Sequence, residues 1–231
     1  MSNKLTVVCV LRTPPAPVVP TTKAKQYGPS DVLRLQKGVA TFLSIPHNFA
    51  CLTDQPDIPG VRTIPLIGDT PGWWGKAELF RPGLFPGPVL YIDLDTAICN
   101  EIDSLVHSCT GRPFVATKEP GYGRLASGIL YWEGDQSYLW DAYCADPKGI
   151  QYKYKRKPFI GDQAFLADNL KEYTFFTDDP AVPESWFCRM KANTTPLPDT
   201  RFLVAAGVTN KLYDARYDNH PWVKKFWKDI I

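Results

Sequence analysis

Hydrophobic residues in the first half of the chain form short apolar runs, separated by segments in which apolar positions recur every three or four residues. Four runs are typical of buried strands and cover residues 5–10, 49–52, 61–66 and 89–92. Residues 31–43 have helical spacing with Ser30 as the predicted N-cap, and residues 73–80 form a second predicted helix. Strands that alternate with helices predict an α/β fold with a mostly parallel sheet.

The second half of the chain continues this alternation. Strand patterns cover residues 114–117, 125–132 and 201–205, and helical patterns cover residues 135–143, 162–171 and 220–231. The 22 prolines cluster at 14–20, 82–88 and 180–198, where they indicate ordered loops rather than domain linkers. We therefore expect one domain over residues 1–231.

Composition excludes several classes of protein. The 231 residues are 44% hydrophobic, enough for a full core, yet no apolar stretch reaches the 18 or more residues that cross a bilayer. The N-terminal apolar run is too short for a secretory signal, so we expect a soluble, cytoplasmic protein. The six cysteines form no C-x-x-C pair and are expected to be reduced, which argues against structural zinc or a disulfide framework.

One basic stretch could bind nucleic acid although the net charge is only +2. Lys153, Lys155, Arg156 and Lys157 alternate with tyrosines, which combines neutralisation of a phosphate backbone with stacking on bases. The alternative is an ordinary solvated loop.

The strongest chemical signal is the pair Asp93 and Asp95 at the end of the strand predicted over 89–92. In an extended backbone, residues two apart project from the same face, so both carboxylates could bind one divalent cation. Oxygen ligands suit Mg²⁺ or Mn²⁺, with a substrate diphosphate completing the coordination. Ligand crevices of α/β sheets lie at the carboxyl ends of strands. Alternatively, one acid caps the next segment and the other faces water.

Other candidate positions each have a structural alternative. Asp162 could serve only as the N-cap of its helix, and Asp54 could be a turn residue. Lys76 could extend to solvent. The aromatic and aliphatic residues around it are expected in the core, namely Trp73, Trp74, Leu79 and Phe80. The segment 13–25 follows the first strand, where α/β proteins place substrate-binding loops, but it could equally be disordered.

Several strings, taken in order along the chain, resemble one family. They are VVCVLR at 7–12, KQY at 25–27, CLTD at 51–54, PGWWGKAELFRP at 71–82, YIDLDT at 91–96 and GDQ at 161–163. Together they resemble the GT-A-fold nucleotide-diphospho-sugar transferases, specifically the glycogenin-like retaining glycosyltransferases and their phage and bacterial relatives. The resemblance implies a Rossmann-like nucleotide-binding half over residues 1–100 and an acceptor and sugar half over residues 101–231.

The resemblance also implies roles for individual residues. Asp93, Leu94 and Asp95 would form the D-x-D motif that holds Mn²⁺ or Mg²⁺ against the donor diphosphate. The remaining donor contacts would come from Val10, Leu11, Arg12, Tyr27, Asp54, Lys76, Ser127, Gly128 and Lys211. Asp162 and Gln163 would bind hydroxyls of the donor sugar beneath its anomeric carbon and act in catalysis.

The implied chemistry is transfer of the sugar with retention of anomeric configuration. The metal and Lys76 would stabilise the departing nucleoside diphosphate. Retention would follow from attack on the same face or from a covalent intermediate on a residue such as Asp162, and in an inverting enzyme Asp162 would be the general base.

The chain departs from the family pattern at two positions. Ala206 stands where relatives carry a histidine that binds the metal, and His220 is a possible replacement ligand. Ala126 stands where relatives carry an asparagine beside the sugar. These departures leave two hypotheses open. One is an active, metal-dependent glycosyltransferase that uses a nucleoside-diphosphate sugar, with uridine diphosphate expected, and the other is a catalytically silent relative that binds a nucleotide sugar or a partner.

The acceptor is open at this stage. A glycan, a protein hydroxyl, a small metabolite and a modified base in DNA all supply the hydroxyl that transfer requires. The basic stretch near residue 155 makes DNA one candidate, especially if the chain is phage-encoded, in which case the protein would act in the host cytoplasm.

Overall fold

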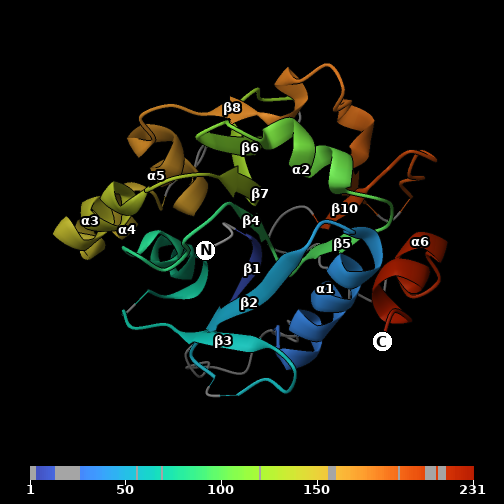
Figure 1. Cartoon of the computed structure of the whole chain (residues 1–231), viewed down its shortest axis with the longest axis horizontal. Coiled ribbons are helices and arrows are strands. Elements are labelled where there is room, and N and C mark those ends of the chain that lie inside the picture. Colours follow the sequence, from blue (N-terminus) through green and yellow to red (C-terminus); the bar gives the residue numbers. More distant parts are fainter. Residues whose placement is uncertain are drawn as a thin grey trace.

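The computed structural model contains two β-sheets with helices packed against them (Figure 1). It describes residues 4–13, 27–55, 57–68, 70–119, 121–155, 160–191, 193–205, 212 and 217–231. The larger sheet has seven strands in the order β3-β2-β1-β4-β7-β6-β8, and the smaller has three in the order β5-β10-β9.

The larger sheet is mixed, and its strands from the N-terminal part of the chain are parallel to one another. Its strands are β1 (Leu5–Leu11), β2 (His47–Thr53), β3 (Arg62–Pro65), β4 (Val89–Ile92), β6 (Phe114–Lys118), β7 (Leu125–Trp132) and β8 (Thr174–Phe175). Strands β3, β2, β1 and β4 are parallel, and β7 runs antiparallel to both β4 and β6. This sheet therefore joins strands from both predicted halves of the chain.

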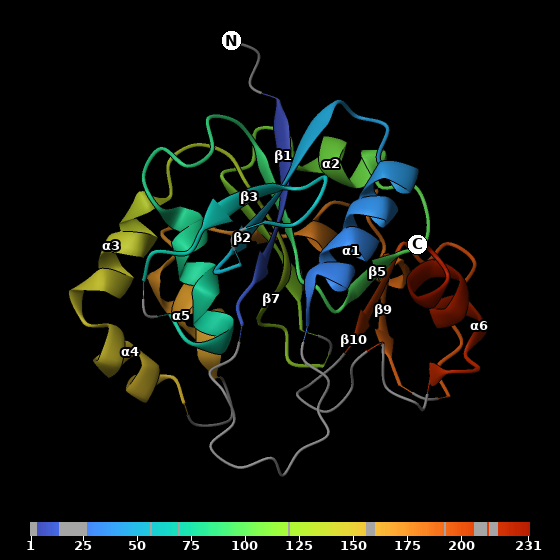
Figure 2. The ribbon, with the colours of Figure 1, turned by 90° about the horizontal axis from the view of Figure 1, so that it is seen from below.

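Helices cover both faces of the larger sheet because its central strands bury side chains in both directions. Val7 and Cys9 of β1 face one core cluster, and Val8 faces the other. Figure 2 shows one face covered by α1 (Pro29–Phe42) and α2 (Asp103–Cys109). The opposite face carries η1 (Gly72–Phe80), α3 (Ser137–Ala145) and α5 (Gly161–Asn169), with α4 (Pro147–Lys153) continuing from α3.

The smaller sheet consists of β5 (Thr96–Ile98), β9 (Phe187–Met190) and β10 (Phe202–Ala205). Strand β10 pairs antiparallel with β5 and parallel with β9. The C-terminal turns, α6 (Pro221–Val223) and η5 (Lys224–Lys228), pack on this sheet through Val223 and Trp227. Two short 3₁₀ turns, η2 (Phe176–Asp178) and η3 (Glu184–Trp186), precede β9.

The predicted strands and helices are mostly confirmed, with corrections at their ends. The first helix begins at Pro29 with Gly28 as its N-cap, so Ser30 is not the cap. Proline is favoured in the first helical turn, and Asp31 accepts a hydrogen bond from the Gly28 amide at 2.9 Å, which fixes this start. Residues 72–80 form a 3₁₀ rather than an α-helix, and the C-terminal helix is shorter than predicted. Within the described ranges, no helix is long and apolar enough to span a bilayer.

Candidate active site

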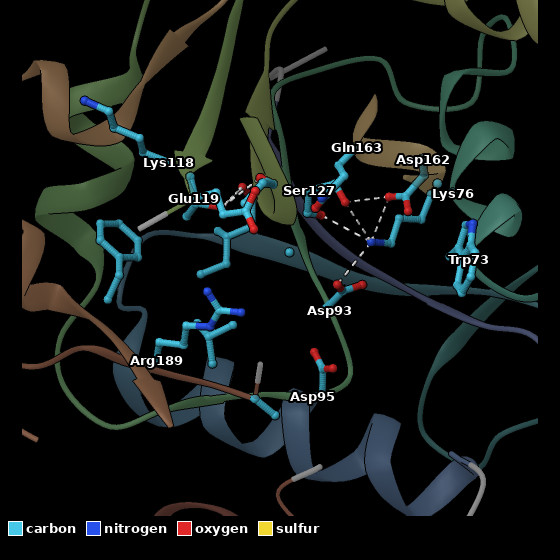
Figure 3. Close-up of a pocket in the computed structure, with 18 of the residues that line it drawn as sticks. Trp73, Lys76, Asp93, Asp95, Lys118, Glu119, Ser127, Asp162, Gln163 and Arg189 are labelled. Carbon is cyan, nitrogen blue, oxygen red and sulfur yellow. Dashed lines mark hydrogen bonds and ion pairs between the residues drawn. The ribbon is translucent and has the colours of Figure 1, made fainter. Parts of the chain in front are cut away.

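A cavity of about 410 Å³ opens between the end of β4, the start of α5 and the strands β9 and β10 (Figure 3). Its described lining consists of Trp73, Lys76, Asp93, Asp95, Thr117, Lys118, Glu119, Ala126, Ser127, Gly128, Ile129, Ile160, Gly161, Asp162, Gln163, Phe187, Arg189, Val204 and Ala205. The cavity thus draws its walls from both sheets. It also collects five of the residues that the sequence predicts for donor binding or metal binding, together with both predicted catalytic residues.

Lys76 lies at the centre of the polar groups that line the cavity. Its ammonium nitrogen is 3.1 Å from a carboxylate oxygen of Asp93 and 3.0 Å from one of Asp162, and it donates to the Ser127 hydroxyl at 3.2 Å. The Ser127 hydroxyl in turn donates to Asp162 at 2.5 Å. Lys76 and Asp162 are each only 8% exposed, so Lys76 does not extend to solvent. The structure therefore unites residues from η1, the turn after β4, β7 and α5 in one charged cluster.

An irregularity between β6 and β7 places Ser127 in this cluster. Ala116 pairs with Leu130, but the next residue, Thr117, pairs with Ala126, so three residues of β7 have no partner on β6. Such a bulge reorients side chains near functional sites. Thr117 stabilises it by donating its hydroxyl to the Ala126 carbonyl at 2.8 Å. Ser127 lies within this bulge, and its hydroxyl contacts Lys76.

The start of α5 positions Asp162. Gly161 has φ of +74°, a conformation that favours glycine, and a Cβ added there would lie 2.8 Å from the indole nitrogen of Trp73. The N-cap of α5 is Ile160, so the interpretation of Asp162 as the N-cap is wrong. Its carboxylate instead binds Lys76 and Ser127, and Gln163 lines the cavity beside it.

Asp93 and Asp95 reach the same cavity by a different route from the predicted one. Strand β4 ends at Ile92, and the Thr96 amide donates to the Asp93 carbonyl at 3.1 Å, so a turn rather than an extended backbone separates the two acids. Figure 3 shows both carboxylates facing the cavity. The Asp93 amide donates to the Gly128 carbonyl at 2.8 Å, and the Tyr91 hydroxyl donates to the Asp93 carboxylate. Despite this turn, Asp93 and Asp95 line the same cavity, as the predicted metal site requires.

The charges in the cluster shift one another's pKa values. Burial raises the pKa of Asp93 from 3.8 to about 6, opposed by Lys76 and reinforced by the negative charge of Asp95. For Lys76, burial disfavours the ammonium ion, but the carboxylates of Asp162 and Asp93 outweigh it, so its pKa is raised. Burial and the neighbouring Asp93 raise the pKa of Tyr91, which keeps its hydroxyl protonated. Near neutral pH, Lys76 is charged and two of its three hydrogen-bonding partners are acids.

The acid pair fits a hard divalent cation. Both side chains offer only carboxylate oxygens. Burial raises the pKa of Asp93 and repulsion from Asp95 adds to it, and a cation between the two acids would relieve this repulsion. Within the described ranges, no third histidine, cysteine, aspartate or glutamate joins them. A two-carboxylate site of this kind suits Mg²⁺ or Mn²⁺, which accept phosphate and water oxygens as further ligands.

The predicted nucleoside contacts lie outside the described lining of this cavity. Leu11 and Leu94 are packed in the core, which leaves only their backbone for a ligand. At the end of β1, Asp54 accepts hydrogen bonds from the amide and hydroxyl of Thr13 at 3.0 Å and lies 3.8 Å from the Arg12 guanidinium. Asp54 thus holds the end of β1.

Two further donor candidates also fall outside the cavity lining. They are Val10 and Tyr27, whose side chains are partly buried. Tyr27 packs against the core cluster on the α1 face of the larger sheet. Their assignment to a nucleoside pocket stays a prediction.

Four predicted positions lie outside the described residues. They are Arg156, Lys157, Ala206 and Lys211. His220 is described, and its ring nitrogen lies 2.8 Å from the Thr194 carbonyl oxygen, away from the cavity lining.

The basic stretch is only partly suited to stacking on bases. Tyr154 is 6% exposed and belongs to the core, and its hydroxyl donates to Asp168 at 2.8 Å. Tyr152 is exposed, but the Lys155 ammonium lies 3.9 Å from the centre of its ring. Lys153 forms an exposed ion pair with Asp168. The predicted use of both tyrosines as stacking platforms is therefore wrong for Tyr154.

Sequence reasoning missed part of the cavity wall and misplaced one tryptophan. Trp74, Leu79 and Phe80 are core residues as expected, but Trp73 is 48% exposed and lines the cavity. Lys118, Glu119, Phe187 and Arg189 also line it and were not predicted. Phe187 and Arg189 alternate on the short strand β9, and this period of two is the only signal that could have marked them.

Comparison with known proteins identifies the fold. No family model matches the chain, and no curated protein matches its sequence. The glycosyltransferase GlyE of Streptococcus pneumoniae TIGR4 has a similar structure, with a TM-score of 0.62 and 14% identity over 92% of this chain and 57% of that one. The chain thus spans little more than half the length of GlyE.

A second group of similar structures matches over nearly the whole length of both chains. The galactosyltransferase LgtC, in complex with donor and acceptor sugar analogs, has a TM-score of 0.54 and 13% identity, covering 91% of this chain and 90% of that one. An active-site mutant of LgtC has a TM-score of 0.58 and 14% identity, covering 96% and 94%. The predicted GT-A-like fold is therefore confirmed, while the glycogenin-like and phage relationships stay predictions.

Proposed function

We propose that this protein transfers a sugar from a nucleoside-diphosphate sugar, with uridine diphosphate as the expected nucleotide, to a hydroxyl group of an acceptor. The observation that carries the proposal is the Lys76 cluster: a buried cation held by Asp93, Asp162 and Ser127 on the wall of a 410 Å³ cavity. A fixed cation beside two acids suits a reaction in which negative charge develops on a leaving diphosphate. The similarity of the fold to structures of glycosyltransferases supports this assignment.

Asp93 and Asp95 would hold Mn²⁺ or Mg²⁺ against the diphosphate of the donor. Bound there, the ion would neutralise part of the charge on the phosphate oxygens and make the diphosphate a better leaving group. The chain's own contribution is to fix the two carboxylates. Tyr91 and the Gly128 carbonyl hold the side chain and the amide of Asp93, and the Ala205 amide donates to the Asp95 carbonyl at 3.0 Å.

The reaction exchanges one bond at the anomeric carbon for another. The bond from this carbon to the diphosphate oxygen breaks, and its electron pair stays with the diphosphate. The acceptor oxygen forms the new bond to the same carbon and loses its proton, which the departing diphosphate can take. Lys76 would stabilise the charge that develops during bond breaking, because its ammonium is already oriented and largely excluded from water.

Asp162 and Gln163 would position the donor sugar at the start of α5. Lys76 and Ser127 both bind the same carboxylate oxygen of Asp162, and among the described residues none binds the second oxygen, which could reach a sugar hydroxyl or the anomeric carbon. We propose retention of configuration, with attack from the face that the leaving group occupied or through a covalent intermediate on Asp162.

A silent relative that binds a nucleotide sugar without turnover is the alternative function. Ala126 favours it, because it lines the cavity with a methyl group where a polar side chain would bind a sugar hydroxyl. Ser127 and Gly128 lie beside it and supply a hydroxyl and a close backbone approach, which favours the active enzyme.

Thermal shift with a panel of nucleotide sugars, with and without Mn²⁺, tests binding, and a donor-hydrolysis assay tests turnover. We expect stabilisation by a uridine-diphosphate sugar only when Mn²⁺ is present, followed by slow hydrolysis. Asp93→Asn combined with Asp95→Asn should abolish both, whereas the exposed control Asp141→Asn should not. Binding without hydrolysis would support the silent relative, and donor affinity that survives the double substitution would refute the metal site.

A modified base in DNA stays a prediction for the acceptor. Its support is the basic stretch, of which the described part offers Lys153, Lys155 and the exposed Tyr152. Binding of duplex DNA should weaken with salt and disappear when Lys153, Lys155, Arg156 and Lys157 are all replaced by alanine. DNA binding that is indifferent to these changes would remove this acceptor from consideration.

A further inference from the structure

The wall of the cavity opposite Lys76 carries a second set of charges that the proposed transfer does not use. Arg189 extends from β9 toward the middle of the cavity (Figure 3), and Lys118 and Glu119 line the cavity at and just after the end of β6. This wall is formed by the end of β6 and by β9. The Lys76 cluster lies on the other side of the cavity, at the end of β4 and the start of α5, where we place the donor.

Positive charge exceeds negative charge among the described residues of this wall, which are Arg189, Lys118 and Glu119. The carboxylate of Glu119 is engaged by the Arg124 guanidinium at 2.8 Å. Lys118 has its ammonium 5.5 Å from the centre of the Phe175 ring. Arg189 forms no ion pair or hydrogen bond with any residue in the described ranges. The wall therefore presents two cations, of which Arg189 is the one directed into the cavity.

The surroundings of Arg189 suit a ligand that is partly apolar. Arg189 is opposite Val204 in the pairing of β9 with β10, and Val204 lines the cavity. Phe187, two residues earlier on the same face of β9, is stacked on Phe202 with the ring centres 5.5 Å apart. A sugar ring or similar scaffold could pack on these groups while an attached anion reached the guanidinium.

We infer that the acceptor carries an anionic group, a phosphate or a carboxylate, and that Arg189 binds this group through its planar guanidinium. A guanidinium forms paired hydrogen bonds with either anion, and Lys118 adds positive potential nearby. On the donor side, Lys76 and the cation that the acid pair would hold would already serve the diphosphate. The inference rests on the proposed function, because it assigns the acceptor side of the same cavity.

Binding to protein loaded with uridine diphosphate and Mn²⁺ tests the inference, because the donor phosphates are then already in place. Calorimetry would compare glucose 6-phosphate and glucuronate with neutral glucose. We expect both anionic sugars, or one of them, to bind at least tenfold more tightly than glucose, and Arg189→Gln to remove this preference. Arg62→Gln, which changes an exposed arginine on β3, is the matched control and should keep the preference.

Each other outcome decides against the inference in a recognisable way. If Arg189→Gln weakens uridine diphosphate binding as strongly as it weakens the anionic sugars, Arg189 serves the donor phosphates instead. If glucose binds as tightly as its anionic counterparts, or if none of the three binds to the loaded protein, the acceptor assignment is wrong. If uridine diphosphate with Mn²⁺ does not bind at all, the proposed function fails first, and the two failures are thereby distinguished.

Discussion

Helix η1 carries two buried charged residues, Lys76 and Glu78, whose hydrogen-bonding partners differ in kind. Glu78 is fully buried and accepts hydrogen bonds from the amides of Ile67 and Gly68 at 2.7 and 3.1 Å and from the Thr70 hydroxyl at 2.8 Å, with the Arg81 guanidinium at 3.3 Å. Its partners are mainly the backbone and neighbours of one loop.

Lys76 instead binds side chains that come from three other elements and border a cavity. The difference shows how to separate a structural charge from one available for chemistry. The carboxylate of Glu78 is satisfied by four donors, two of them backbone amides that cannot move without unfolding the loop. The partners of Lys76 are acids and a hydroxyl that also face the cavity, so a ligand can replace or join them. Burial alone does not distinguish the two residues, since Glu78 is 0% exposed and Lys76 is 8% exposed.

The largest expected effect is on stability, from Glu78→Ala. It leaves two amides, a hydroxyl and the Arg81 guanidinium without their acceptor, and breaking a buried charged pair costs about 3–5 kcal/mol. Urea unfolding should show a loss of this size. The control Glu172→Ala, at an exposed site, should change the free energy of unfolding by less than about 0.5 kcal/mol. A similar small loss for both would mean that the Glu78 contacts contribute little.

The next effect is on activity, from Lys76→Met, which keeps an unbranched side chain one atom shorter and removes its charge. Loss of a preorganised electrostatic group lowers turnover by roughly 10²–10³-fold. We expect the rate of donor hydrolysis to fall by this factor. The free energy of unfolding should fall less than in Glu78→Ala, because the acids beside Lys76 can be protonated or hydrated from the cavity. Equal losses of stability in Lys76→Met and Glu78→Ala would show that the two buried charges do not differ in this way.

The pH dependence of metal binding should follow Asp93, whose pKa is raised to about 6. A cation binds the ionised carboxylate, so Mn²⁺ affinity should fall about tenfold for each pH unit below this value. Stability should change in the opposite sense. Between pH 3.8 and about 6 the folded state binds more protons at Asp93 than the unfolded state, so its contribution to stability decreases as pH rises.

Calorimetric titration with Mn²⁺ at a series of pH values from 5 to 7.5 measures the change in metal affinity. In Asp93→Asn the remaining affinity should lose the pH dependence near 6. An unchanged profile in that variant would show that another group controls metal binding.

The smallest effect is expected from Ser127→Ala. The change removes the hydrogen bond to Asp162 and the contact with Lys76, and one hydrogen bond to a charged group is worth about 1.5–3 kcal/mol. Because Lys76 still holds Asp162, we expect only about a tenfold loss of donor hydrolysis. Ser185→Ala, which removes a serine–aspartate hydrogen bond outside the cavity lining, is the control and should be neutral for activity.

Much of the fold follows from the sequence because its main strands are buried on both faces. Continuous apolar runs such as residues 89–92 identify such strands without an alignment. The short strands β5, β8 and β9 were missed, because two to four residues give too little periodicity to separate them from loops. The start of α1 was misplaced because Pro29 and Gly28 outweigh the capping preference of Ser30.

The candidate site was predictable where local spacing determines it and not where tertiary contacts do. Asp93, Asp95, Lys76 and Asp162 all reach the cavity as expected. Their mutual pairing depends on how η1, the turn after β4 and the start of α5 pack together, and Ser127 joins them from the bulge in β7. Packing and register shifts of this kind leave no simple pattern in a sequence. Arg189 was missed for the same reason, since only the pairing of β9 with β10 brings it to the cavity.

The short connection between β4 and β5 has a mechanical consequence. Three residues, from Asp93 to Asp95, separate the last residue of a strand in the larger sheet from the first residue of a strand in the smaller one. Because so few residues join these two strands, a rotation of one sheet against the other would alter the spacing of the two carboxylates. A ligand that bridges the two carboxylates would therefore restrict the movement of one sheet relative to the other, and the angle between the sheets would affect how tightly the ligand binds.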